Sequence, residues 1–301
     1  MPPISTLSAS GPTSRTYISQ RLKLHYVDWG NTSAPPLILL HGGRDHCRSW
    51  DWIAPRLADR YHVIAPDLRG HGDSAWADGS TYMVPGHIYD LAQLIHQQKL
   101  APVTLVAHSL GGTVAVRYAG LYPDNVRRLI SIEGLGQTHN PRRSGKPTAE
   151  RFVKWIDDTR ALASHSPRRY ATLDEAVERM KEANKHLSEE QARHLTVHGM
   201  SQNEDGTFSW KFDPYVRPFA PYDITTEDAE KLWAKITCPT LLCWGSESWH
   251  TNPAVDGRLR HFQNARVLPF QGAGHWVHHD QLEPFMAAAE SFLAETRSAA
   301  P

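Results

Sequence analysis

Residues 105–112 read LVAHSLGG, and this stretch decides the fold. An apolar run ends abruptly at His108 and Ser109, and the small residues Ala107 and Gly111 flank the serine. Small neighbours let a strand turn sharply into a helix, because the two elements can then approach closely. The pattern small-x-Ser-x-small therefore predicts a nucleophile elbow. Such a turn exposes the serine hydroxyl beside a helix N-terminus, where developing negative charge is favoured.

A buried strand-to-helix turn with a capping serine also fits residues 107–111. Two other segments help to distinguish this structural role from a catalytic one. The segment His41-Gly42-Gly43 ends an earlier apolar run, as in an ordinary turn or in an oxyanion loop. In an oxyanion loop the glycines let backbone N–H groups face the serine, and we expect Gly43 and Leu110 to supply these N–H groups. The segment GAGHW places His275 in a glycine-rich loop after the last expected strand, where it is the candidate general base.

Short apolar runs alternate with segments of helical spacing along most of the chain. The later runs are continuous, as in strands that are buried on both faces of a parallel sheet. Helical spacing is found over 49–59 and 87–97. The alternation predicts an α/β fold with a mostly parallel, doubly wound sheet. The expected strands are LKLHYVDW (22–29), PLILLHGG (36–43), YHVIAPD (61–67), VTLVAHS (103–109), RRLISIEG (127–134), PTLLCWG (239–245) and ARVLPFQG (265–272).

The alternation stops between about residues 135 and 235, where the chain is polar and helical in pattern. We expect this segment, 135–235, to be a helical lid inserted between two parts of an α/β core, 1–134 and 236–301. The first dozen residues, rich in Ser, Thr and Pro, are expected to form a loose tail. The elements expected in the lid are a helix over 151–162, helices opened by capping boxes at Thr172–Glu175 and Ser188–Gln191, and a short strand over 208–212.

Four segments together resemble the α/β-hydrolase fold superfamily: HGG (41–43), APDLRGHGDS (65–74), AHSLGG (107–112) and GAGH (272–275). The resemblance spans about residues 22–293 apart from the lid. It implies that Ser109 is the nucleophile and His275 the base, and it gives the 67–74 turn a structural role. Ala107 stands where glycine is usual at the first small position. Dehalogenases and epoxide hydrolases of this superfamily use an aspartate nucleophile, so Ser109 argues against those reactions.

The resemblance implies a carboxylic acid that orients the histidine. In much of the superfamily this acid is the fourth residue of a Gly-x-x-Asp turn after the lid, which here reads 245–248 and ends at the uncharged Ser248. Some relatives, including haloalkane dehalogenases, carry the acid at the end of the strand after the elbow helix, where this chain has Glu133. A carboxylate that ends an apolar strand needs a partner when it is buried. We therefore predict Glu133 as the acid, with Glu247 and Asp256 as alternatives.

Two other interpretations of these residues are structural or metal-based. Glu133 at a strand end also fits a salt bridge with an arginine, such as Arg128 or one in the lid. His275, His278 and His279 share one helical face, which is a pattern found in metal sites. No cysteine or carboxylate cluster joins these histidines in the sequence, so we expect neither a metal nor a cofactor.

Composition narrows the class of protein further. Lys and Arg total 32, as do Asp and Glu, so no basic field attracts nucleic acid or anionic lipid. No apolar run approaches the roughly 20 residues that span a bilayer, and the N-terminus lacks a signal-peptide pattern. Cys47, Cys238 and Cys243 show no metal-ligand spacing and cannot all pair, which indicates a reducing compartment. We expect a soluble, cytoplasmic protein that binds neither nucleic acid nor membrane.

These features predict a serine hydrolase that cleaves a carboxylic ester of a small molecule through an acyl-enzyme on a Ser-His-Glu triad. Lactonases, carbon–carbon bond hydrolases and aminopeptidases occur on the same fold and are the alternatives. An aminopeptidase needs a lid carboxylate for the substrate amine, and Glu150, Asp157 and Asp158 are the candidates. A non-catalytic ligand-binding protein on this fold is the alternative from another class.

Overall fold

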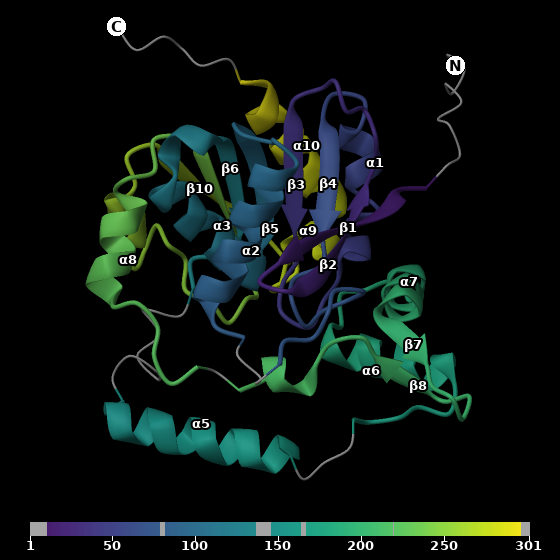
Figure 1. The fold of residues 1–301 in the computed structure, drawn as a ribbon. Helices are drawn as coiled ribbons and strands as arrows, with labels where there is room; N and C mark the ends of the chain where they lie inside the picture. Colours follow the sequence, from purple (N-terminus) through teal and green to yellow (C-terminus); the bar gives the residue numbers. More distant parts are fainter. Residues whose placement is uncertain (1–10, 79–81, 137–145, 164–166, 219, 296–301) are drawn as a thin grey trace, which may run out of the picture.

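An eight-stranded sheet forms the centre of the computed structural model, which describes residues 11–78, 82–136, 146–163, 167–218 and 220–295 (Figure 1). Its strands are β1 (Thr13–Ser19), β2 (Leu22–Asp28), β3 (Pro36–Leu40), β4 (His62–Pro66), β5 (Val103–His108), β6 (Val126–Ile132), β9 (Thr240–Gly245) and β10 (Ala265–Phe270). Their order is β1-β2-β4-β3-β5-β6-β9-β10. β2 is antiparallel to β1 and to β4, and every other pair of neighbours is parallel.

Helices cover both faces of this sheet (Figure 1). β5 is buried along its whole length, and its side chains alternate between two cores. Leu105 and Ala107 pack in one core and Val106 packs in the other. The predicted α/β fold with a mostly parallel, doubly wound sheet is thereby confirmed. Residues of α2 (Val84–Gln97), α3 (Ser109–Leu121) and α8 (Thr226–Trp233) line the first core, and residues of α1 (Ala54–Leu57), α9 (Val277–Asp280) and α10 (Leu282–Ala294) line the second.

β1 and the helix expected over 49–59 differ from the sequence expectation. β1 is not among the expected strands, because its sequence TSRTYIS buries only Tyr17 and Ser19 and has no apolar run. Its pairing with β2 holds it at the edge of the sheet. The helix expected over 49–59 is divided into a 3-10 turn, η1 (Cys47–Trp50), and the short helix α1. Pro55 lies in the first turn of α1, where its missing N–H is tolerated, but its ring excludes a continuous helix from η1.

Between β6 and β9 lies a stretch of mostly helical elements, here called the inserted segment (residues 135–235), whose last helix, α8, belongs to the first core. The two predicted caps are present: Thr172 Oγ1 accepts from the N–H of Glu175 at 3.2 Å, and Ser188 Oγ accepts from that of Gln191 at 3.1 Å. Only the Ser188 cap is reciprocal, because the Glu175 side chain accepts from the N–H of Ala171 instead. The elements before α8 are α5 (Thr148–Ala163), α6 (Leu173–Ala183), α7 (Glu189–Gly199), β7 (Met200–Gln202), β8 (Phe208–Trp210) and η3 (Pro214–Val216).

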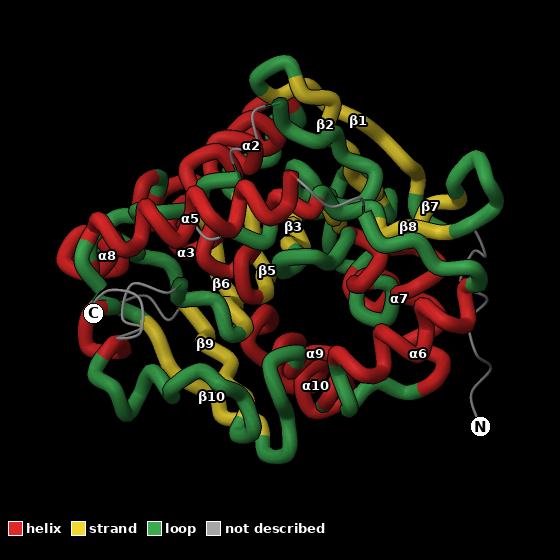
Figure 2. Tube along the Cα trace, turned by 90° about the horizontal axis from the view of Figure 1, so that it is seen from below, coloured by secondary structure: helices red, strands yellow, loops and turns green. Residues whose placement is uncertain are grey.

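The inserted segment packs on the loops that follow β3 and β4. His46 Nε2–H donates to the carbonyl of Leu195 at 2.9 Å, and the N–H of Asp213 donates to the carbonyl of Gly70 at 2.8 Å. Figure 1 shows α5, α6, α7 and the β7–β8 hairpin beyond this end of the sheet, and Figure 2 views the molecule from that side. α8 instead packs on α3, where a Cβ on Gly120 would lie 2.5 Å from the carbonyl of Leu232. The remaining 3-10 turns are η2 (Pro123–Asn125) and η4 (Arg258–His261).

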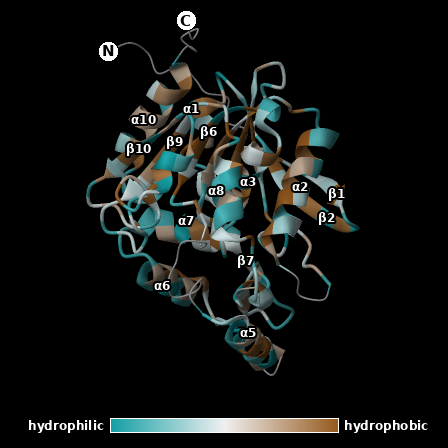
Figure 3. Cartoon of the chain, turned by 90° about the vertical axis from the view of Figure 1, so that its left-hand side faces the viewer, coloured by the Kyte–Doolittle hydropathy of each residue, from teal (hydrophilic) through white to brown (hydrophobic). Residues whose placement is uncertain are grey.

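Hydropathy separates the sheet from the inserted segment (Figure 3). The strands are coloured mostly as hydrophobic, whereas α6 carries extensive hydrophilic colour. α5 buries none of its residues, and Phe152, Val153 and Ile156 on it are exposed. The apolar side chains of this helix are therefore not part of a core. Among the helices of the described ranges, none is long and apolar enough to cross a membrane.

Buried histidines underlie the loops at the carboxyl ends of β3 and β4. His41 Nδ1–H donates to the carbonyl of Gly42 at 2.7 Å, and its Nε2 accepts from the N–H of Leu68 at 2.9 Å. Both contacts suit a neutral ring. Burial lowers the pKa of His41 to about 3 and that of His71 to about 4, and it lowers the pKa of His87 well below the ordinary value. These rings are therefore neutral in the folded protein at neutral pH.

We expect the free energy of unfolding to fall steeply below pH 6.5. Between about pH 6.5 and pH 4 the unfolded chain binds protons at these histidines and the folded chain does not, so acid favours unfolding by about 1.4 kcal/mol per pH unit for each ring. Urea unfolding at pH 7.5, 6.5 and 5.5 measures the slope. His87→Phe should reduce the slope of the unfolding free energy against pH by about 1.4 kcal/mol per pH unit, the contribution of one ring. His96→Gln, on the exposed side of the same helix, should leave the slope unchanged. Equal slopes in both variants would contradict this account.

Candidate active site

Ser109 lies at a sharp turn between β5 and α3. Its φ is 51°, a left-handed conformation that is strained for a residue with a side chain. The turn requires close approach on two sides: a Cβ on Gly111 would lie 2.5 Å from the carbonyl of His41, and one on Gly112 would lie 2.6 Å from the Cα of Gly134. Only glycine fits at these positions. The sequence pattern and the backbone thus agree on an elbow that presents Ser109 at the start of a helix.

His275 faces Ser109 from the loop between β10 and α9. Its Nε2 lies 2.9 Å from the Oγ of Ser109, which is hydrogen-bonding distance. His108 Nε2–H donates to the carbonyl of His275 at 2.9 Å and so fixes the backbone of the loop. Trp249 lies against the ring of His275 with centroids 4.3 Å apart, although the tryptophan is 68% exposed. The imidazole is therefore held between a buried histidine and an exposed indole.

Glu133 directly follows β6 and has a second left-handed conformation, with φ 53°. The carboxylate is buried and accepts from the N–H of Gly245 at 2.8 Å and from the Oγ–H of Ser248 at 2.7 Å. Its Oε2 lies 3.6 Å from Nδ1 of His275. Ser248, the uncharged residue that ends the 245–248 turn, thus holds the carboxylate that comes from the neighbouring strand. The structure brings Ser109, His275 and Glu133 together.

The alternative acids lie elsewhere. Glu247 is exposed and pairs with His186 of the inserted segment, 3.5 Å away. Asp256 pairs with Arg258 at 2.8 Å. Arg128, the structural alternative as a partner of Glu133, donates to the backbone carbonyl of Glu295 instead. Of the carboxylates considered from the sequence, Glu133 is the one that faces His275.

Burial sets the protonation of the two titratable groups. It lowers the pKa of His275 to about 3, and His250 adds to this effect, so the imidazole is neutral at pH 7. Burial raises the pKa of Glu133, against the opposing effect of the Gly245 N–H and the Ser248 hydroxyl. A neutral imidazole can accept the serine proton at Nε2. The carboxylate at its other nitrogen stabilises the charge that then forms.

The loop after β3 lies beside the elbow. A Cβ on Gly42 would lie 3.2 Å from the Cβ of Ser109, and the N–H of Gly111 donates to the carbonyl of His41 at 3.2 Å. Gly43 follows and is exposed. Leu110 is the second residue of α3, where helical N–H groups have no intrahelical acceptor. The two expected donors of the oxyanion hole thus lie on the two backbone segments that meet at Ser109.

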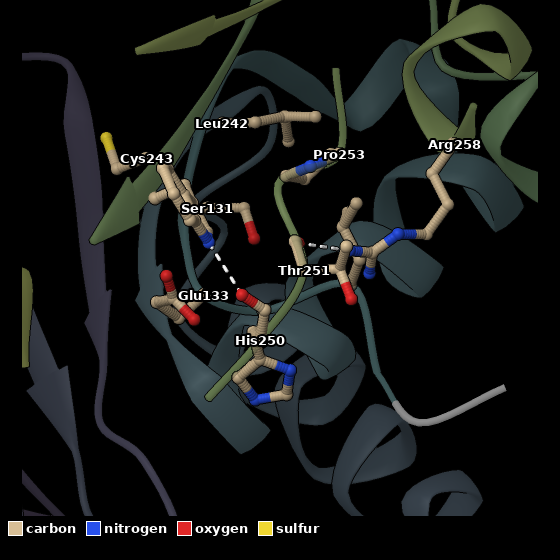
Figure 4. Close-up of a pocket in the computed structure, with 11 residues that line it drawn as sticks. Ser131, Glu133, Leu242, Cys243, His250, Thr251, Pro253 and Arg258 are labelled. Atoms are coloured by element: carbon tan, nitrogen blue, oxygen red, sulfur yellow. Dashed lines mark hydrogen bonds between the residues drawn. The ribbon is translucent and has the colours of Figure 1, made fainter. Parts of the chain in front are cut away.

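Neither of two cavities in the described part of the chain is lined by Ser109 or His275. The smaller one, about 20 Å³, lies behind Glu133 and is also lined by Ser131, His250 and Arg258 (Figure 4). It has room for one water molecule, not for a substrate. The larger one, about 480 Å³, lies between Asp73 and Trp76 of the core and the β7–β8 region of the inserted segment.

Other predicted candidates take no part in this site. Asp157 and Asp158 form ion pairs with Arg160 and Lys154 on their own helix, α5. Glu150 is exposed on the same helix. His278 and His279 lie on α9, and within the described ranges they belong to no group of metal-ligating side chains. One such group does contain His275, together with Glu133 and His250.

Trp249 and His250 also lie at the site, and neither is among the site residues predicted from the sequence. Both follow the end of β9 within a few residues, in the run SESWH. In open α/β sheets, sites form just beyond the carboxyl ends of the parallel strands. The position of Trp249 and His250 shortly after β9 is therefore the sequence signal that could have identified them. His108 has no proposed catalytic role. Its hydrogen bond to the backbone of His275 gives the imidazole before Ser109 a structural role.

Comparison with known proteins places the chain in a family. The family model described as the alpha/beta hydrolase fold matches residues 35–282. The chain is 27% identical to "Esterase Rv0045c" of Mycobacterium tuberculosis, over 90% of this chain and 87% of that protein. It is 28% identical to "sn-1-specific diacylglycerol lipase ABHD11" of Mus musculus, over 88% of this chain and 83% of that protein.

A solved structure extends this likeness to the whole fold. The crystal structure of the hypothetical protein PA1622 from Pseudomonas aeruginosa PAO1 superposes with a TM-score of 0.82 at 25% identity, and the match covers 94% of this chain and 99% of that one. The family match spans most of the chain and includes the segments that carry Ser109, Glu133 and His275. This protein belongs to the α/β-hydrolase fold family and is a hydrolase.

Proposed function

We propose that this hydrolase cleaves a carboxylic ester of a small molecule through an acyl-enzyme formed on Ser109. The observation that carries the proposal is the 2.9 Å contact between Ser109 Oγ and His275 Nε2 at a left-handed elbow. A serine is a weak nucleophile unless a neighbouring base takes its proton as it attacks. The esterase and the lipase among the relatives support an ester as the substrate.

The reaction divides into acylation and deacylation. Ser109 Oγ attacks the ester carbonyl while His275 Nε2 takes its proton, and the N–H groups of Gly43 and Leu110 stabilise the oxyanion. His275 then gives the proton to the departing alcohol, which leaves the acyl group on Ser109. A water molecule, deprotonated by the same nitrogen, attacks this acyl-enzyme and releases the acid. The proton returns to Ser109, so no metal or cofactor is needed.

Glu133 orients His275 in this scheme and stabilises its charged form. The 3.6 Å between Glu133 Oε2 and His275 Nδ1 is longer than a hydrogen bond. Catalytic hydrogen bonds in free enzymes are often long and shorten when substrate binds. The hydroxyl of Ser248 and the N–H of Gly245 hold the carboxylate in place for that step.

We further propose that residues 135–235 act as a lid that sets access and specificity. The hydrogen bond from His46 to Leu195 ties α7 to the loop that continues from Gly43. A lid at this end of the sheet lies over the carboxyl ends of the strands, where ligands bind in such sheets. For the compartment we propose the cytoplasm, which is supported by three buried cysteines that are all free thiols.

A panel of p-nitrophenyl esters of increasing acyl length, assayed beside lactones and aminoacyl amides, tests the reaction class. We expect turnover of short or medium acyl esters above the rates for the other two classes. Equal activity with a chelator is expected, because the scheme uses no metal. Faster turnover of lactones or amides, or loss of activity with the chelator, would contradict the proposal.

Ser109→Ala should lower kcat by about six orders of magnitude, because the alanine variant has no hydroxyl to form the acyl-enzyme. The measurement is steady-state hydrolysis of the best ester of the panel. Unfolding by urea provides the control, since the variant should retain the wild-type fold. Near-normal activity would mean that Ser109 is not the nucleophile.

Glu133→Gln keeps the shape of the side chain and removes its charge, so kcat should fall by about three to four orders of magnitude. Glu247→Gln is the matched control, because Glu247 is exposed and pairs with His186. It should hydrolyse the same ester at nearly the wild-type rate. If Glu247→Gln is the impaired variant and Glu133→Gln is nearly normal, the assignment of the acid is wrong.

Trp155→Ala should change the ranking of substrates in the ester panel more than it changes stability. Trp155 lies on α5, which has no buried residue, so its removal leaves both cores intact. We expect the free energy of unfolding to change by less than about 1 kcal/mol. An unchanged ranking of kcat/KM across the panel would argue against a specificity role for this helix.

A further inference from the structure

His250 lies beside the Glu133–His275 pair although nothing in the proposed reaction uses it. Its backbone is held from two sides: its carbonyl accepts from Trp244 Nε1–H at 2.7 Å, and its N–H donates to Ser248 Oγ at 3.1 Å. Its ring lies 5.2 Å from the ring of His275, at an interplanar angle of 30°. Figure 4 shows His250 and Glu133 lining the same pocket. A second imidazole is therefore fixed near the carboxylate.

The three side chains have the donor set of a zinc site. One ligand atom from each of Glu133, His250 and His275 lies within 4.8 Å of the other two. Imidazole nitrogen with one carboxylate oxygen suits Zn²⁺, whereas Mg²⁺ and Ca²⁺ prefer oxygen alone. The set comes from three segments, β6, the loop after β9 and the loop after β10, which the sheet holds together.

The gap between His275 and Glu133 also has the size of a zinc coordination edge. Nδ1 of His275 is buried, and among the described residues it has no hydrogen-bond partner. It stands 3.6 Å from Oε2 of Glu133. Two ligands about 2.0–2.1 Å from a tetrahedral zinc ion are separated by about 3.3–3.4 Å. A shift of a few tenths of an ångström places both atoms at that separation, with His250 as the third ligand.

Nearby charges favour this group over the two other groups of metal-ligating residues in the described ranges. The charge of Arg258, which lines the same pocket, acts on Glu133 and His250, but its guanidinium pairs with Asp256 at 2.8 Å and not with a ligand of this group. In the group formed by Asp51, His194 and His198, the guanidinium of Arg48 lies 2.6 Å from the aspartate and opposes a cation.

The remaining group consists of His25, Cys47 and Asp67. Its histidine nitrogen is already used, because His25 Nδ1 lies 2.7 Å from one oxygen of Asp67. A cation there would have to displace this contact. The Glu133 carboxylate also accepts two hydrogen bonds, but Nδ1 of His275 has no hydrogen-bond partner among the described residues.

We propose that Glu133, His250 and His275 form an inhibitory Zn²⁺ site. Zinc at Nδ1 of His275 uses the lone pair of that nitrogen, so the ring proton resides on Nε2. Nε2 then has no lone pair for the proton of Ser109, and general-base catalysis stops. The metal also takes the carboxylate that would stabilise an imidazolium. Binding needs only the three ligands, whereas its inhibitory effect rests on the proposed function.

Zinc binding is measured by calorimetry on the full-length Ser109→Ala protein without a histidine tag. We expect one Zn²⁺ site, no binding of Mg²⁺, and at least a tenfold weaker Kd for Zn²⁺ when His250→Phe or His250→Gln is added. His198→Gln, from the group at Asp51, is the matched control and should keep the Kd within twofold. Absence of zinc binding, or an unchanged Kd in a folded His250 variant, would overturn the site.

Inhibition is measured on the wild-type protein with the best ester of the panel. Activity should fall in proportion to zinc occupancy and return when EDTA is added, and the inhibition constant should rise at least tenfold in the His250 variants, each compared with its own uninhibited rate. Undiminished turnover at saturating Zn²⁺ would overturn the inhibitory role. If zinc binds through His250 but the zinc-free protein hydrolyses no ester, the proposed function fails and the metal site stands.

Discussion

The site depends on a close approach of backbones at the carboxyl ends of β5 and β6. Ser109 and Glu133 both adopt left-handed conformations there, each of which costs about 1–3 kcal/mol and persists only where the surroundings fix it. The surroundings are the contact between Gly112 and Gly134 and the hydrogen bond from the N–H of Glu133 to the carbonyl of Cys243 at 3.0 Å. One set of packing constraints thus places Ser109 and Glu133, because their strands are neighbours.

Burial supplies the electrostatics of this arrangement. The packing that leaves no room for side chains at the elbow also excludes water from His108 and His275, and it keeps both rings neutral at pH 7. His108 uses its one N–H to hold the loop of His275, so a neutral, buried imidazole serves as a positioning group. The ring of His275 is thus held uncharged beside Ser109, with the carboxylate of Glu133 on its other side.

The neighbouring ends of β6 and β9 explain why Glu133 can lie beside His275. β6 and β9 are adjacent and parallel, so the residues just beyond their ends meet. A carboxylate at either end reaches the same imidazole, provided the other end offers a donor. Here Glu133 extends from β6 and Ser248 donates from the loop after β9. The long side chain of Glu133 and the short side chain of Ser248 together span the gap between the two strand ends.

Local patterns in the sequence determine the order of strands and helices, the elbow at Ser109 and the loop position of His275, because apolar periodicity and small residues act over a few neighbours. Glu133 follows from the sequence only through a resemblance and the uncharged residue at 248. Only the tertiary structure decides that β1 is a strand, since its order comes from pairing with β2 and not from apolar residues of its own. It alone brings Trp249 and His250 to His275, because that proximity arises where the loop after β9 meets the loop after β10 at one edge of the sheet.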